Sequence, residues 1–326
     1  MRWRQAMQTA LYGPSGFFVR SSPAAHFRTS AHASPVFASA LLRLVMVVDE
    51  ALGHPDRLDL VDVGAGRGEL LAALLAAAPA AVRPRLRPVG VELAPRPPGL
   101  PHAVRWRSSP PASVSGLLLA TEWLDNVPLD VESSGRYVSV DPRSGTESAG
   151  SLVDAADAAW LARWWPDGPR REVGRPRDRA WAAAVGAVSR GLAVAVDYGH
   201  LRDTRPVGGS LTGFRAGRQV PPVPDGSCDI TAHVAVDSVA AAGSDAAGLP
   251  YALLSQRDAL RALGASGARP PPALASTDPA GYVRALAVAS ATGELTDPAG
   301  LGGHWWLLQP VGLDPAATMG WTGVAR

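Results

Sequence analysis

Three glycines at the end of an apolar run are the residues of this chain best suited to hold a small ligand. Residues 58–63 read LDLVDV, and Gly64, Gly66 and Gly68 follow, before an Ala/Leu-rich run. This order predicts a buried strand, a tight loop and the start of a helix. Glycine permits positive φ angles and lets a ligand reach the backbone without a Cβ in the way. The first N–H groups of the following helix suit a carboxylate or phosphate.

An acidic residue at the end of the next apolar run extends this site. Glu92 ends the run RPVGVE, where an acidic side chain can accept hydrogen bonds from ribose hydroxyls. The glycine spacing is G-x-G-x-G and differs from the dinucleotide fingerprint. A structural turn with a surface glutamate is the alternative. The loop and the acid together indicate an adenosine ligand, and we assign Asp62, just before the loop, to the same site.

Polar residues also follow two later apolar runs. Glu122 and Asp125 lie three positions apart after residues 116–120, and Asp197 and Tyr198 follow residues 192–196. The carboxyl ends of parallel strands meet at one edge of a sheet, where ligands bind. We therefore expect these side chains near the glycine loop. The alternatives are that Asp125 caps a turn, Glu122 is solvated and Asp197 only holds backbone.

The alternation of apolar runs and helical patterns predicts an α/β fold, a mostly parallel sheet with helices on both faces. The predicted strands are 58–63, 87–92, 116–120, 192–196 and 305–309, with short pieces near 137–140. The predicted helices are 35–52, 69–78, 178–189 and 256–264, and residues 200–250 are expected to be rich in loops. We expect an N-terminal cap segment at 1–53, a cofactor-binding core at 54–200 with an insertion at about 129–176, and a substrate-cleft and sheet-completing part at 201–326.

Composition narrows the class of protein. The 326 residues carry a net charge of only +2, which argues against a nucleic-acid partner. A single cysteine excludes an internal disulfide and fits a reducing compartment. Neither an N-terminal apolar leader nor a membrane-spanning run is apparent, and the histidines lack metal-ligand spacing. We expect a cytoplasmic protein without a metal, monomeric or weakly dimeric.

Several motifs together resemble one known family. They are, in chain order, ALYGPSGFF, HFRTSAHASPVFA, LVDVGAGRGELL, LLLATEWLDNVPLDV, AVAVDYGH, GSLTGFRAGRQV, DGSCDITAHVAVDSV and LTDPAGLGGHWWLL. The same order is found in a family of S-adenosylmethionine-dependent methyltransferases that includes the mitochondrial complex I assembly factor, which methylates arginine, and many bacterial relatives. The resemblance covers nearly the whole chain. It implies a class I methyltransferase fold (Rossmann-like), S-adenosyl-L-methionine as cofactor, and a substrate cleft that includes Tyr12.

Some positions depart from the family pattern. His26 and His32 stand where the family usually has Asp and Glu, and Ala65 and Glu69 replace the usual Pro and Thr of the glycine loop. The histidine that usually follows the GTL-x-x-Tyr motif is missing. The motifs of the cofactor site therefore match the family better than the motifs of the part that would bind the group to be methylated.

The acceptor determines what the carboxylates must do. An arginine guanidinium is cationic, so carboxylates must orient it and take up charge during transfer. Glu122 and Asp125 are the candidates for this catalytic role. Asp229 and His233 belong to the predicted cleft, and His233 is either a base or a structural histidine. Three functions stay open: methylation of a protein side chain, arginine first, methylation of a small molecule, or a non-catalytic assembly protein.

Overall fold

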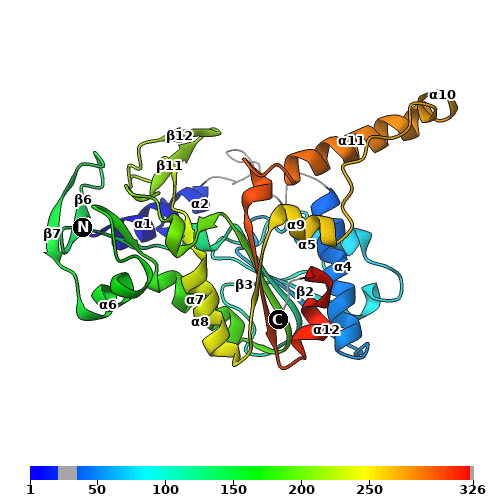
Figure 1. Ribbon diagram of the computed structural model, residues 1–326, viewed down its shortest axis with the longest axis horizontal. Coiled ribbons are helices and arrows are strands. Elements are labelled where there is room, and N and C mark those ends of the chain that lie inside the picture. Colours follow the sequence, from blue (N-terminus) through cyan, green and yellow to red (C-terminus); the bar gives the residue numbers. More distant parts are fainter. Residues whose placement is uncertain (21–34, 324–326) are drawn as a thin grey trace.

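A seven-stranded sheet forms the centre of the computed structural model, which describes residues 1–20 and 35–323 (Figure 1). The strand order is β15-β16-β9-β4-β1-β2-β3. β16 is antiparallel to both of its neighbours, β15 and β9, and the other neighbouring strands of this sheet are parallel. The strands are β1 (Leu58–Val63), β2 (Leu86–Val91), β3 (Arg105–Arg107), β4 (Val114–Thr121), β9 (Val188–Asp197), β15 (Ala252–Ser255) and β16 (Trp305–Val311). The predicted α/β class with a mostly parallel sheet is confirmed.

Helices cover both faces of this sheet because its strands are apolar on both sides. On β1, Leu60 packs with one helical layer and Val61 with the other, since successive side chains of a strand point to opposite faces. The first layer contains α4 (Pro35–Ala51), α5 (Glu69–Ala77) and α9 (Gln256–Ala262). The second contains α7 (Arg175–Gly186) and α8 (Val236–Ala247).

A second region lies beside the central sheet and contains the N-terminal helix (Figure 1). In α1 (Trp3–Tyr12), Trp3, Met7 and Leu11 recur every four residues and are fully buried. They form a separate core with residues of two small sheets, among them Val131 and Ile230. These sheets consist of β5 (Asp130–Ser133), β6 (Arg136–Val140), β7 (Glu147–Leu152) and β8 (Arg171–Val173), and of β11 (Thr212–Arg215), β12 (Arg218–Val220) and β13 (Asp229–Thr231).

The remaining elements are short, apart from one long helix. They are α2 (Phe17–Arg20), α6 (Ala155–Trp164), α10 (Leu274–Thr277), α11 (Pro279–Leu295), α12 (Pro315–Met319), the pair β10 (Gly199–His200) and β14 (Val234–Ala235), and the 3₁₀ turns η2 (Arg83–Arg85), η3 (Leu124–Asn126), η4 (Arg202–Thr204), η5 (Leu301–Gly303) and η6 (Gly320–Thr322). Together α10 and α11 form an arm that extends away from the body (Figure 1).

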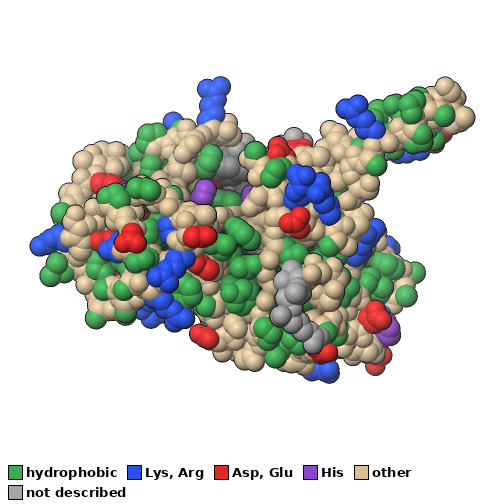
Figure 2. Space-filling model, in the orientation of Figure 1, with side chains coloured by type: hydrophobic (Ala, Val, Ile, Leu, Met, Phe, Trp, Pro, Cys, Tyr) green, Lys and Arg blue, Asp and Glu red, His purple; other side chains and the backbone are tan. Residues whose placement is uncertain are grey.

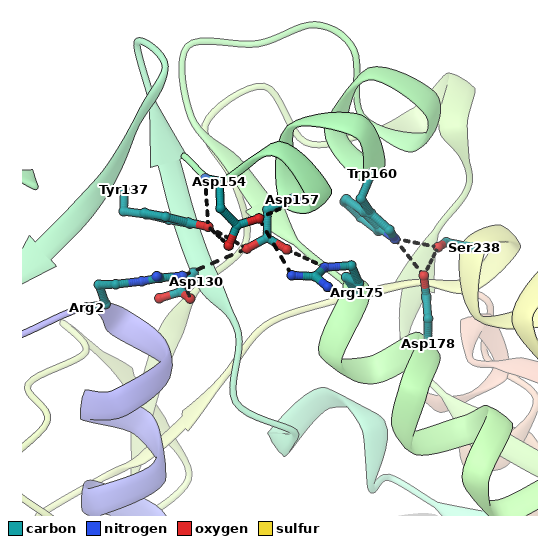
Figure 3. Close-up of polar contacts among 9 residues, drawn as sticks. All are labelled: Arg2, Asp130, Tyr137, Asp154, Asp157, Trp160, Arg175, Asp178 and Ser238. Carbon is teal, nitrogen blue, oxygen red and sulfur yellow. Dashed lines mark hydrogen bonds and ion pairs between the residues drawn. The ribbon is translucent and has the colours of Figure 1, made fainter. Parts of the chain in front are cut away.

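Buried polar contacts join the second region to the helices that cover the central sheet (Figure 3). The carboxylate of Asp157 on α6 accepts hydrogen bonds from the hydroxyl of Tyr137, at 2.6 Å, and from the guanidinium of Arg175 on α7. Arg2 lies over the Tyr137 ring and forms an ion pair with Asp130. A second group lies nearby, in which Asp178 accepts hydrogen bonds from Trp160 and Ser238, both at 2.6 Å. These contacts hold α1, α6, α7 and α8 in one arrangement.

Several predicted elements need correction. Residues 200–250 contain, besides the expected loops, α8 and five short strands that were not predicted. Predicted helix 178–189 begins earlier, at Arg175 with Pro176 in its first turn, and ends before β9 starts at Val188. The predicted 305–309 strand extends to Val311, and α12 and η6 follow it. The local sequence pattern does not predict α1, α10, α11 and β3, because their side chains are buried by distant partners or are hardly buried at all.

Candidate active site

The glycine loop after β1 has the backbone conformation that its sequence requires. Gly64, Gly66 and Gly68 have φ angles of +74°, +55° and +77°. A Cβ on Gly64 would lie 2.8 Å from the Trp123 side chain, so this glycine allows close packing. A Cβ on Gly66 would meet nothing within 4 Å. The loop therefore presents free space at Gly66, and this space belongs to a cavity that the loop lines.

Glu92 lies beside this loop because β1 and β2 pair in register up to Val63 and Val91. Its Oε2 accepts a hydrogen bond from the Gly66 N–H at 3.1 Å, and its Oε1 accepts one from the Leu93 N–H at 2.7 Å. The Glu92 carboxylate is thus held against the backbone of the glycine loop. Both residues line the same cavity.

Asp62 lines the cavity from the end of β1 and is only 4% exposed. Burial raises the pKa of its carboxyl to about 7, and the charges of Glu92 and Glu69 act in the same direction. Glu69, in the first turn of α5, also lines the cavity. Three carboxyl groups therefore surround the glycine loop and favour positively charged groups of a ligand.

The cavity extends from this loop to residues of the second region, among them Tyr12 and Asp229. Its volume is about 1580 Å³, compared with about 300–1,000 Å³ for most ligand pockets. The residues that line it include most of the predicted site: Tyr12, Asp62, Gly64, Gly66, Glu92, Glu122, Asp125, Tyr198, Asp229 and His233. Figure 2 shows histidine side chains at a hollow on this face, between the β11–β12 hairpin and the central-sheet half. One space therefore has room for a ligand at the loop and a second group beyond it.

Glu122 has an unusual backbone where β4 ends. Its φ angle is +49°, a conformation that residues other than glycine rarely adopt. Its N–H donates to the carbonyl of Val196 on β9 at 2.7 Å, which continues the pairing of the two strands. Strained residues held by their surroundings are common in functional sites. The side chain of Glu122 is half-buried and lines the cavity.

Asp125 lies three residues further on, in η3, and is 4% exposed. Its Oδ2 accepts hydrogen bonds from the hydroxyls of Tyr198 and Thr231, the latter at 2.7 Å. Its Oδ1 is buried and has no hydrogen-bond partner among the residues that the structure describes. The carboxylate is thus firmly oriented and keeps one oxygen for a further donor.

Asp197 and Asp229 are buried as well, at 3% and 5% exposed. Asp197 accepts hydrogen bonds from the backbone N–H groups of Leu124 at 2.9 Å, Asp125 at 3.2 Å and Tyr198 at 3.0 Å, so it holds the loop after β4. Asp229 accepts one from the Asn126 side chain at 2.8 Å. Burial raises the pKa of both carboxyls well above their usual range, and the charge of Asp125 adds to the effect.

The other predicted cleft residues lie along the cavity wall. The Tyr12 hydroxyl donates to the Asn126 carbonyl at 3.2 Å, which ties α1 to the loop after β4. His233 is exposed, with its ring centroid 5.1 Å from that of Tyr198. Two predicted site residues do not line the cavity. Asp197 holds the loop after β4 instead, and Gly68 of the glycine loop serves packing, because a Cβ there would meet Leu100 at 2.7 Å.

Pattern analysis missed three residues of this site. Thr231 holds Asp125, and Arg177 donates to four backbone carbonyls of the surrounding loops, Asp125, Val127, Ala232 and His233. His304 is 8% exposed, lines the cavity and packs on the Tyr198 ring; burial lowers its pKa to about 4. The motif GLGGHWW contained His304, but no spacing rule connects it with residues near 125 and 198. His26 and His32 lie outside the described residues.

The comparisons with known proteins identify the family. The model described as "Putative S-adenosyl-L-methionine-dependent methyltransferase" matches residues 40–253. The chain belongs to this family. The protein is thus an S-adenosyl-L-methionine-dependent methyltransferase, and S-adenosyl-L-methionine is its cofactor. The resemblance seen in the sequence is confirmed at this level.

Solved structures agree with this assignment. A Burkholderia thailandensis protein described as a "likely methyl transferase", bound to S-adenosylhomocysteine, is 26% identical with a TM-score of 0.77, covering 96% of this chain and 88% of that one. A native structure of an uncharacterized protein from the same organism and superfamily is 27% identical with a TM-score of 0.78, covering 98% and 89%. A search of curated proteins finds no match to this methyltransferase. Within residues 1–20 and 35–323, no helix is long and apolar enough to cross a membrane.

Proposed function

We propose that this methyltransferase transfers the methyl group to a protein side chain, and that arginine is the acceptor residue. The observation that carries the proposal is the shared cavity, with the glycine loop at one part and the oriented carboxylate of Asp125 at another. S-adenosyl-L-methionine supplies a methyl group on a positively charged sulfur. The residues of the chain bind, orient and shield the two partners.

The residues we assign to the cofactor are Asp62, Gly64, Gly66 and Glu92, whereas Gly68 of the same loop gives room to Leu100. The open side of Gly66 offers space next to backbone N–H groups, which suits a carboxylate group. Glu92 is placed to accept hydrogen bonds from ribose hydroxyls once Oε2 leaves the Gly66 N–H. The carboxyl groups of Asp62 and Glu69 suit the cationic groups of the cofactor. The fit supports the cofactor at this loop.

The residues we assign to the acceptor are Glu122 and Asp125. A guanidinium has five N–H donors and no acceptor, so it needs oxygen atoms that are not already hydrogen-bonded. Asp125 Oδ1 is such an atom within the described residues, and Tyr198 and Thr231 keep it in place. Holding the guanidinium at a fixed distance from the methyl group is the main contribution that the protein makes to such a displacement.

The raised pKa values of two further buried carboxyls bear on the charge of the acceptor. The raised pKa values of Asp197 and Asp229 mean that these groups hold protons more readily than ordinary aspartates. A guanidinium in contact with the acceptor side lowers the pKa of nearby carboxyls and favours their charged form. We also propose that the protein works in the cytoplasm as a monomer or weak dimer, without nucleic acid, metal or membrane.

Incubation with labelled cofactor and fractionated cell extract tests the acceptor. We expect label in protein bands, and mass spectrometry of digested bands should find methylated arginine. Label that stays in the small-molecule fraction would instead assign a metabolite acceptor. A Gly66→Val variant serves as the control for transfer by other enzymes in the extract.

A further inference from the structure

Two arginines face each other at the tip of the β11–β12 hairpin. The turn consists of Ala216 and Gly217, with φ angles of +49° and +73°, and it pairs Arg215 with Arg218 directly across the two strands. Side chains directly opposite in an antiparallel pair lie on the same face, with Cβ atoms about 4.5–5.5 Å apart. The two guanidinium groups therefore start from neighbouring points on one face of the hairpin.

This pairing of like charges is not compensated. Both arginines are exposed, and neither has a hydrogen bond or ion pair to an acidic group in the part of the chain that the structure describes. Like charges directly opposite each other destabilise a sheet. By contrast, Arg170 pairs with Glu147 at 2.7 Å, and Arg171 with Glu132 at 2.6 Å. The tip thus concentrates positive charge that fold stability does not require.

The hairpin places this charge just outside the cavity. Phe214 and Gln219, the next residues along each strand, line the cavity. Because side chains alternate along a strand, Arg215 and Arg218 point to the other face. In Figure 2 a basic side chain protrudes beyond the β11–β12 hairpin. The pair can therefore contact a part of the acceptor that stays outside, but not the group that enters the cavity.

We propose that Arg215 and Arg218 bind the carboxylates of an acidic segment of the acceptor polypeptide, next to the residue that is methylated. This inference rests on the proposed polypeptide acceptor. Two guanidinium groups on one face can bind carboxylates by charge-assisted hydrogen bonds. A nucleic acid fits less well, because Glu122 and Asp125 line the adjoining cavity and the chain has a net charge of only +2. A peptide with acidic residues on both sides of one arginine matches the arginine pair outside and the carboxylates of the cavity inside.

Fluorescent peptides test the inference with the protein loaded with S-adenosylhomocysteine. Each short peptide has one central arginine, with aspartates, asparagines or lysines on both sides. We expect the aspartate peptide to bind about five-fold to ten-fold tighter than the asparagine peptide. The double variant R215Q/R218Q should lose this preference and bind the asparagine peptide as before. R215E/R218E should prefer the lysine peptide, and the control Arg269→Gln, at another exposed arginine, should behave as wild type.

Three results would overturn the inference: no preference in the wild-type protein, an unchanged preference in R215Q/R218Q, or a single-stranded oligonucleotide that displaces the aspartate peptide at lower concentration than the unlabelled peptide does. Methyl transfer from labelled cofactor separates this inference from the proposed function. If no arginine peptide is methylated while R215Q/R218Q abolishes the preference, the arginine acceptor is wrong and the anion site stands. If arginine is methylated while wild type and R215Q/R218Q prefer the aspartate peptide equally, the arginine acceptor stands and the anion site is wrong.

Discussion

The hydroxyl of Tyr198 donates a hydrogen bond to the carboxylate of Asp125, although the two residues are 73 positions apart in the chain. Tyr198 follows β9 and Asp125 lies in the loop after β4, so the contact depends on the pairing of these two strands. Thr231, from β13, donates to the same oxygen at 2.7 Å. Three separate segments therefore fix the direction of one carboxylate.

Tyr198→Phe should reduce methyl transfer while leaving cofactor binding nearly unchanged. The variant removes one of the two donors that orient Asp125 and keeps the aromatic ring that packs on His304. We expect turnover to fall about ten-fold. Calorimetric titration with S-adenosylhomocysteine should give a dissociation constant within about two-fold of wild type. Tyr251→Phe, at an exposed tyrosine, is the control. Wild-type turnover in Tyr198→Phe would remove this contact from the proposed mechanism.

Gly66→Val should abolish cofactor binding because the new side chain would occupy the open space of the loop. The substitution also strains a residue with φ of +55°. Gly99→Val is a matched control, since Gly99 has a φ angle of +80°, equally free surroundings and no place in the cavity wall. Thermal-shift assays with and without S-adenosyl-L-methionine compare the two. A folded Gly66→Val protein that is stabilised by the cofactor as much as wild type would contradict the site.

Glu122→Gln should cut turnover with little change in cofactor affinity. The change keeps the shape of the side chain and removes the charge that we expect to hold a cationic acceptor. A loss of about ten-fold or more in kcat/KM for an arginine peptide is expected. Glu50→Gln, at an exposed glutamate on α4, controls for a change of net charge. If cofactor affinity falls as much as turnover, Glu122 belongs to the cofactor side instead.

Asp62 should make the stability of the protein depend on pH. Its pKa is about 7 in the folded chain, against about 3.9 when unfolded, so folding takes up a proton between these values. This contribution to stability is fully present below about pH 4 and is lost as the pH rises through about 7, by up to about 1.4 kcal/mol per unit. Urea unfolding of wild type and Asp62→Asn at several pH values measures it. The wild-type free energy of unfolding should fall relative to the variant as the pH rises, and a constant difference would refute this.

The sequence by itself was sufficient to predict the local structure of the segment that we propose for the cofactor. The strand, glycine loop, helix and second strand are contiguous between residues 58 and 92, and each element has a local pattern. The apolar runs of β1 and β2 are buried on both faces, and positive φ angles at Gly64 and Gly66 follow from local chemistry. Strand ends at Glu122 and Tyr198 were also predictable, because parallel strands bring their carboxyl ends to one edge.

Only the tertiary structure decided how the part of the cavity that we propose for the acceptor is built. Arg177, Thr231 and His304 reach the site from α7, β13 and the loop before β16, and no spacing along the chain relates them. The same holds for α1, whose Trp3 and Met7 are buried only because two distant small sheets pack on them. A local pattern reports the periodicity of one segment, whereas the direction of Asp125 depends on hydrogen bonds across 73 and 106 positions. Such long-range contacts exist only when the whole chain is folded.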